Sequence, residues 1–251
     1  MNYQTYGLLI LAGVVPSLAW LWFFLSKDCH PEPKRRIAQT FILAIVLAPL
    51  AIAAQWLFVY VVGRFVPLEV IATSPLFFGW ASIVEEIVKL MAVTYVVYRT
   101  VDFDEPVDGM IYLITAALGF AAIENILIMF RNASEGFEIA LQIWALRFFG
   151  ATLLHALSSA ILGYFVALAW FRYNHSRKII FMGIMIASAF HLLFNMLLVD
   201  LSPQNGLMFS SLILAVMIFL VSILFVKVRD RSPSKLNPNL STYRPMIGYG
   251  V

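Results

Sequence analysis

The sequence is poor in charge and has almost no cysteine. Asp, Glu, Lys and Arg make up 12% of the 251 residues, whereas 62% are hydrophobic and the mean hydropathy is +0.88. A soluble domain carries about twice that charged share, so the composition excludes a soluble protein. The single cysteine, Cys29, excludes an intramolecular disulfide. We therefore expect an all-α, polytopic integral membrane protein embedded in a lipid bilayer.

The chain leaves no room for a separate soluble domain. A helix needs ~20 apolar residues to cross a bilayer, and we predict about seven such helices, over roughly 6–25, 37–62, 76–98, 108–130, 147–171, 179–199 and 207–227. We expect 1–229 to form one transmembrane domain. The segment 230–251 contains Pro, Ser and Asn without an apolar pattern, so we expect a disordered cytoplasmic tail.

Basic residues are concentrated on one side of the predicted bundle. Seven spans place thirteen Lys and Arg on one side and only three, Arg64, Arg131 and Arg147, on the other. The side rich in Lys and Arg faces the cytoplasm, so we expect the N-terminus outside and the C-terminus inside. Because these charges lie at membrane edges, the pI of about 9.0 does not indicate a nucleic-acid partner.

Strongly polar residues lie inside four successive spans. An ionisable group at such a depth costs at least ~2.5 kcal/mol, which makes it a candidate functional residue. At ~1.5 Å per residue, four of these groups, Glu85, Glu124, His155 and His191, lie about 9 to 14 Å below the same surface, so they could meet at one level. The residues are Glu85, Glu86, Lys89, Glu124, Asn125, His155, His191 and Asn195, with Gln55 in the preceding span.

Spacing along each helix suggests how these groups pair. Glu85 and Lys89 are i, i+4, so we expect an ion pair between them, whereas Glu86 is turned by ~100° towards another neighbour. One carboxylate is then neutralised, and the other is a candidate general acid or base. We interpret Ser158 and Ser159, among small residues, as a helix-packing face rather than as nucleophiles.

The sequence leaves the question of a metal open. A His₂Glu set suited to one zinc ion is present in the sequence. It consists of His155, His191 and a glutamate. We take the glutamate as Glu124, with Glu85 and Glu86 as alternatives. The HExxH motif of many zinc proteases is absent. A metal-free glutamate mechanism and a single-zinc mechanism both remain possible.

Four motifs stand in order on the four polar spans. They are Glu85-Glu86-Ile-Val-Lys89, Phe120-Ala-Ala-Ile-Glu124-Asn125, His155-Ala-Leu-Ser-Ser159 and His191-Leu-Leu-Phe-Asn195. In this order they resemble the motifs of the PrsW family of intramembrane proteases, distant relatives of CAAX prenyl proteases and of the CPBP family. The resemblance covers residues 76–199.

The resemblance implies an intramembrane endopeptidase in the cytoplasmic membrane of a prokaryote. It further implies a site-1-type cut, on the outer side, in a single-pass substrate similar to an anti-sigma factor. Catalytic roles fall to Glu85, Glu86, Glu124, His155 and His191. Supporting roles fall to Lys89, Phe120, Asn125, Asn195 and Ser159.

Other functions compete with this interpretation. Buried Glu, Lys and His also form proton relays, so a proton-coupled transporter is one alternative. An inactive relative that acts as a membrane chaperone or receptor is a second, and a di-haem protein using His155 and His191 is a third.

The connection 131–146 mixes apolar and polar residues, which is typical of an interfacial segment, with Trp144 as its anchor. We expect this segment to gate access to the site.

Overall fold

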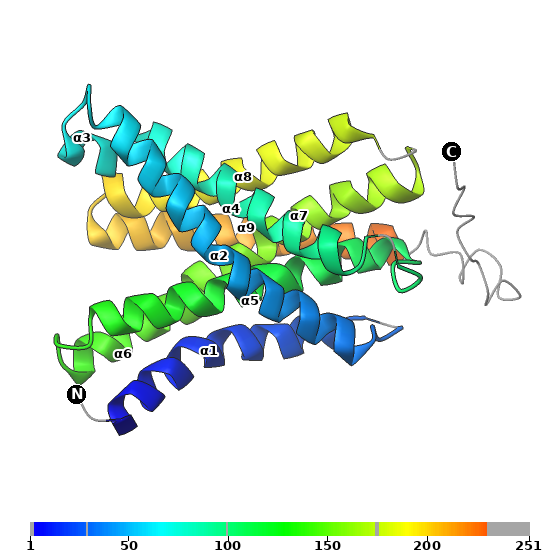
Figure 1. Ribbon diagram of the computed structural model, residues 1–251, viewed down its shortest axis with the longest axis horizontal. Coiled ribbons are helices and arrows are strands. Elements are labelled where there is room, and N and C mark those ends of the chain that lie inside the picture. The colour runs from blue at the N-terminus through cyan, green and yellow to red at the C-terminus, as the bar shows by residue number, and fades with distance from the viewer. Residues whose placement is uncertain (1–2, 29, 99, 174–175, 230–251) are drawn as a thin grey trace, which may run out of the picture.

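The described part of the chain folds into helices, turns and loops without strands. The computed structural model describes residues 3–28, 30–98, 100–173 and 176–229 (Figure 1). Cys29 and the predicted tail 230–251 lie outside the described residues. The elements are α1 (Tyr3–Leu25), α2 (Lys34–Val62), α3 (Leu68–Ala72), α4 (Pro75–Val96), α5 (Pro106–Arg131), α6 (Phe137–Leu146), the π-helical turn η1 (Arg147–Ala151), α7 (Thr152–Phe171), α8 (Arg177–Asp200) and α9 (Pro203–Arg229).

The predicted all-α, polytopic membrane fold is confirmed. Among the described residues, six helical segments are long and apolar enough to cross a membrane: α1, α2, α5, α8, α9 and the continuous segment Phe137–Phe171. The remaining long helix, α4, has 22 residues and carries Glu85, Glu86 and Lys89 in its middle. Each of the seven predicted spans thus coincides with a long helix.

The segment 131–146, which we predict to be interfacial, is partly helical. It is helical from Phe137 onward, and α6 continues through η1 into α7 without a break. Trp144, predicted to be an interfacial anchor, donates its indole Nε1–H to the carbonyl of Ala12 at 2.9 Å. This part of the chain is therefore held against α1.

Two helices that carry motifs begin at defined caps. Ser74 precedes Pro75 at the start of α4, and its Oγ accepts a hydrogen bond from the backbone N–H of Phe77 at 3.1 Å. At the start of α5 the backbone N–H of Glu105 donates to Asp108 Oδ2 at 2.7 Å. These caps fix where each helix starts, and so the depth at which its polar residues lie.

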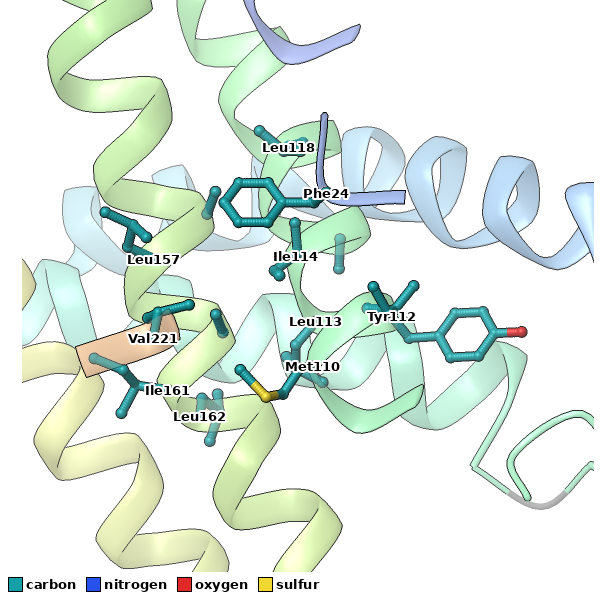
Figure 2. Close-up of a cluster of buried hydrophobic side chains, with 14 of the residues drawn as sticks. Phe24, Met110, Tyr112, Leu113, Ile114, Leu118, Leu157, Ile161, Leu162 and Val221 are labelled. Atoms are coloured by element: carbon teal, nitrogen blue, oxygen red, sulfur yellow. The ribbon is translucent and has the colours of Figure 1, made fainter. Parts of the chain in front are cut away.

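Helices α5 and α7 form the centre of the bundle. Their side chains lie together in the buried cluster of Figure 2, among them Met110, Ile114, Leu157 and Ile161. The two backbones approach closely at Gly109 and Gly163, because a Cβ placed on Gly163 would lie 2.3 Å from the Gly109 carbonyl oxygen. Helix α4 packs against α2, α5 and α8. The polar residues of α4 therefore face the inside of the bundle.

The ends of the bundle are easily distinguished. The start of α1, α3, α6 and the connection between α8 and α9 lie at one end, on the left of Figure 1. We call it the Tyr3 end. The connections between α1 and α2, α4 and α5, and α7 and α8 lie at the opposite end.

Candidate active site

Lys89 forms its ion pair with Glu86, and the predicted pair with Glu85 is wrong. Lys89 Nζ donates to Glu86 Oε1 at 2.7 Å, and both side chains have no exposed surface. Glu86 also accepts hydrogen bonds from Ser158 Oγ at 3.1 Å and from Ser159 Oγ at 2.7 Å. Both oxygens of Glu86 are thus occupied. The two serines that we predicted to be packing residues act as donors to this buried carboxylate.

Glu85 keeps one of its two oxygens buried and without a hydrogen bond from the described part of the chain. Its Oε1 accepts a hydrogen bond from Gln55 Nε2 at 3.1 Å. Its Oε2 is buried and has no hydrogen-bond partner among the described residues. This atom lies 3.7 Å from His191 Nδ1 and 3.9 Å from His155 Nδ1. Glu85 therefore faces both histidines.

His155 connects the buried ion pair to Glu124. Its Nδ1 lies 3.0 Å from Lys89 Nζ, and its Nε2 lies 2.9 Å from Glu124 Oε2. An ammonium group only donates, so Nδ1 accepts the hydrogen bond from Lys89 and the ring proton sits on Nε2, from which it is donated to Glu124. This assigns a neutral His155 with a fixed tautomer.

Arg147 is a site residue that the sequence reasoning missed. Its Nη2 donates to Glu124 Oε2 at 3.0 Å, and its Nε donates to Asn125 Oδ1. Asn125 in turn donates through Nδ2 to Thr152 Oγ1 at 3.0 Å. We had counted Arg147 as a boundary charge. Its position two helical turns before His155 was the available signal, because residues so spaced lie on one face of a helix.

The α8 motif contributes mainly His191. The His191 and His155 rings lie 4.8 Å apart and nearly perpendicular, at 84°, and the buried Nδ1 of His191 has no hydrogen-bond partner among the residues described. Asn195, one turn later, is half-buried, and within the described ranges no hydrogen bond joins it to the site. Phe120 packs beside the cluster, with its ring 5.8 Å from His155 and 5.2 Å from Lys89 Nζ.

Three of the buried side chains suit a metal ion. One ligand atom each from Glu85, His155 and His191 lies within 4.8 Å of the others. Glu85 Oε2 and His191 Nδ1 are both buried without a hydrogen-bond partner from the described chain, which is costly unless another group satisfies them. Two imidazoles and a carboxylate are a donor set that zinc prefers. The residues present therefore fit a divalent cation.

This set differs from the predicted one in its carboxylate. Glu124 Oε2 is held by Arg147 and by His155 Nε2, so Glu85 takes the place that we had given to Glu124. His155 Nδ1 already accepts the hydrogen bond from Lys89. A cation bound at this nitrogen and Lys89 would compete for a single lone pair.

Comparison with known proteins agrees with the geometry of the site. A family profile described as "PrsW family intramembrane metalloprotease" matches residues 32–225. The chain is 32% identical over 193 residues to "Protease PrsW" of Geobacillus kaustophilus, with 76% of this chain and 79% of the relative covered. It is 29% identical over 199 residues to "Protease PrsW" of Bacillus subtilis, with 77% and 84% covered. No solved structure matches the chain.

Proposed function

Because the chain belongs to the PrsW family of intramembrane metalloproteases, we propose that Glu85, His155 and His191 hold a divalent metal ion with which it cleaves a membrane-protein substrate. The observation that carries this proposal is the pair of buried atoms without partners, Glu85 Oε2 and His191 Nδ1. When bound, a divalent ion supplies Lewis-acid polarisation of the peptide carbonyl.

Glu124 is the residue best placed to move protons. Peptide hydrolysis requires a base for the attacking water and a proton donor for the leaving amine. Arg147 and His155 both bind Oε2 of Glu124, and Oε1 accepts no hydrogen bond from the described residues. The Glu124 side chain is 27% exposed, whereas Glu85 is 8% exposed. We assign to Oε1 the transfer of a proton from water to the amine.

Lys89 and Glu86 serve as positioning residues. Lys89 donates to Glu86 and to His155 Nδ1, and Glu86 is fixed in turn by Ser158 and Ser159. While no metal is bound, this set of contacts fixes the tautomer of His155 and the direction of its Nε2–H. A metal bound at Nδ1 would replace the hydrogen bond from Lys89 and leave Nε2–H donated to Glu124. We infer that these residues orient His155 towards Glu124 without touching the substrate.

We further propose that the substrate is a single-pass protein cut near the Tyr3 end of the bundle. The excess of Lys and Arg at the opposite end supports an orientation in which the Tyr3 end faces outward. A site-1-type cut in a protein similar to an anti-sigma factor agrees with this orientation and rests on the resemblance of the motifs.

The test is cleavage of single-pass membrane reporters by the purified protein, together with a measurement of its metal content. We expect cutting and about one bound metal per chain. Glu85→Gln and His191→Ala should abolish both, whereas Glu135→Gln, the same chemical change at an exposed position between α5 and α6, should change neither. Mapping the cut also tests the orientation.

Chelation separates the two mechanisms that the sequence left open. We expect a chelator to abolish cutting and added zinc to restore it. Cutting that persists in metal-free protein and still requires Glu85 would overturn the metal proposal and make Glu85 the base. If wild-type protein that is folded and loaded with metal cuts no reporter, the peptidase proposal fails for this class of substrate.

A further inference from the structure

A cavity lies beside the candidate active site at the Tyr3 end. Its volume is about 440 Å³, and its walls come from the end of α6, from η1, from the end of α8 and from the start of α9. We call it the η1 cavity. Its walls are mostly apolar, with Phe149, Phe194, Leu198 and Leu207 among the lining residues. Such a volume lies within the ~300–1,000 Å³ range of ligand pockets.

The η1 cavity adjoins the site at two places. Arg147 lines the cavity and also binds Glu124, which is the most exposed carboxylate of the site. On α8, Phe194 and Leu198 follow His191 by three and seven residues, so they lie on the same helix face. An occupant of the cavity would therefore lie next to both His191 and the Arg147–Glu124 pair.

The cavity opens towards the side of the bundle that a bilayer would surround. Phe149, Leu198 and Leu207 line it and are 64%, 45% and 48% exposed. These residues belong to helical segments long and apolar enough to cross a membrane. An occupant that enters laterally thus comes from the bilayer, where a membrane-spanning segment presents apolar side chains.

The π-helical turn leaves space in the cavity wall. Gly150 lies in η1 and lines the cavity. A Cβ placed on Gly150 would meet only Phe194 Cζ, at 3.5 Å, which is an ordinary contact. A larger side chain at position 150 would therefore extend into the cavity without a backbone clash. This glycine keeps the space next to Arg147 open.

We propose that the η1 cavity binds a bulky apolar side chain of the substrate's membrane-spanning segment beside the scissile bond, and so determines specificity. This inference rests on the proposed function, because it assumes that a peptide segment reaches Glu124. The predicted gate 131–146 borders the cavity through Ile143 and Leu146.

The first test compares three reporters that differ only in the residue next to the mapped cut: Ala, Leu or Phe. We expect wild type to prefer Leu and Phe. Gly150→Leu should lower kcat/KM for the Phe reporter by on the order of 10-fold or more and leave the Ala reporter nearly unchanged. Ser211→Leu, which fills the cavity from α9, should act in the same way. Gly7→Leu, on α1 with nothing within 4 Å, is the matched control.

A selective loss on large side chains supports the cavity as a specificity pocket. Equal losses on all three reporters, or no loss, would overturn it. Wild-type cutting in the same experiment would leave the peptidase proposal intact, so the two failures are distinguishable.

The second test does not require activity. A photo-crosslinking residue at position 207, in the Glu85→Gln background, should capture the Leu reporter. The same residue at position 212, which is 59% exposed on α9 and does not line the cavity, should not. Crosslinks only to lipid or to a second copy of the chain would overturn the proposal. Capture at position 207 without cutting by wild type would support binding of the segment in the cavity, but would overturn the peptidase proposal and with it the role of the cavity in specificity.

Discussion

Replacing Lys89 with methionine should destabilise the protein by several kcal/mol. Lys89 and Glu86 have no exposed surface, and their charged atoms lie 2.7 Å apart. Removing one partner of a buried ion pair costs about 3–5 kcal/mol, because the other charge is left uncompensated. Ser158 and Ser159 would still donate to Glu86, so we expect the lower part of that range, about 3 kcal/mol.

A double-mutant cycle shows which glutamate pairs with Lys89. Lys89→Met with Glu86→Gln removes both charges, so the double variant should lose about 1–3 kcal/mol less than the sum of the single variants. Glu85→Gln alone should cost less than about 1 kcal/mol, because Glu85 accepts a single hydrogen bond, from Gln55. The coupling of Lys89 to Glu85 should be smaller than its coupling to Glu86 by at least about 1 kcal/mol.

Unfolding in detergent micelles, after treatment with a chelator, measures these free energies. Metal has to be removed first, since an ion bound to the native state adds its own stabilisation and would be lost in Glu85→Gln. A larger coupling of Lys89 to Glu85 than to Glu86 would refute the observed pairing. In that case the i, i+4 pairing expected from the sequence would hold.

Two further predictions concern stability. Gly163→Ala should lower the free energy of unfolding by about 1–3 kcal/mol or more, because its Cβ would meet the Gly109 carbonyl oxygen at 2.3 Å. Gly79→Ala, whose Cβ would have its nearest contact at 3.7 Å, should be neutral or stabilising in the same unfolding assay. Burial raises the pKa of Glu32 from 4.5 to about 7. The Glu32 carboxyl therefore stays protonated to a higher pH in the folded state than in the unfolded state. Its contribution to stability is fully present only below pH 4.5. That contribution, at most about 3 kcal/mol, is lost as the pH rises to about 7. Plots of unfolding free energy against pH that run parallel for wild type and Glu32→Gln between about pH 4 and 8 would contradict this prediction.

The fold was predictable because membrane spans have a strong sequence signal. An apolar stretch of ~20 residues identifies a span without any knowledge of its neighbours. The continuation of the helix from Phe137 into the next span was not predicted, because Glu138 and Gln142 interrupt the apolar pattern. This part of the helix is stabilised by contacts that spacing does not encode, such as the hydrogen bond from Trp144 to α1.

The sequence predicted that most of these candidate residues would lie together, but not how they pair. Lys89 is one helical turn from both Glu85 and Glu86, so spacing alone does not choose between i, i+3 and i, i+4. The choice follows from α7, which presents Ser158 and Ser159 to Glu86. Arg147 was missed for a similar reason, since an arginine near a span end usually marks a membrane boundary.

The distribution of charge supports a requirement for Glu85 under either mechanism, as a metal ligand or as the base. Glu86 has Lys89 and Glu124 has Arg147 as a cationic partner, whereas no Lys or Arg nitrogen of the described residues forms an ion pair with Glu85. One positive charge is thus missing beside Glu85, and either a metal ion or a proton can supply it. Glu85→Gln removes the need for both, so the variant should fold without metal and cut nothing. A chelator, in contrast, removes only a metal, and for this reason chelation of the wild type decides between the two mechanisms.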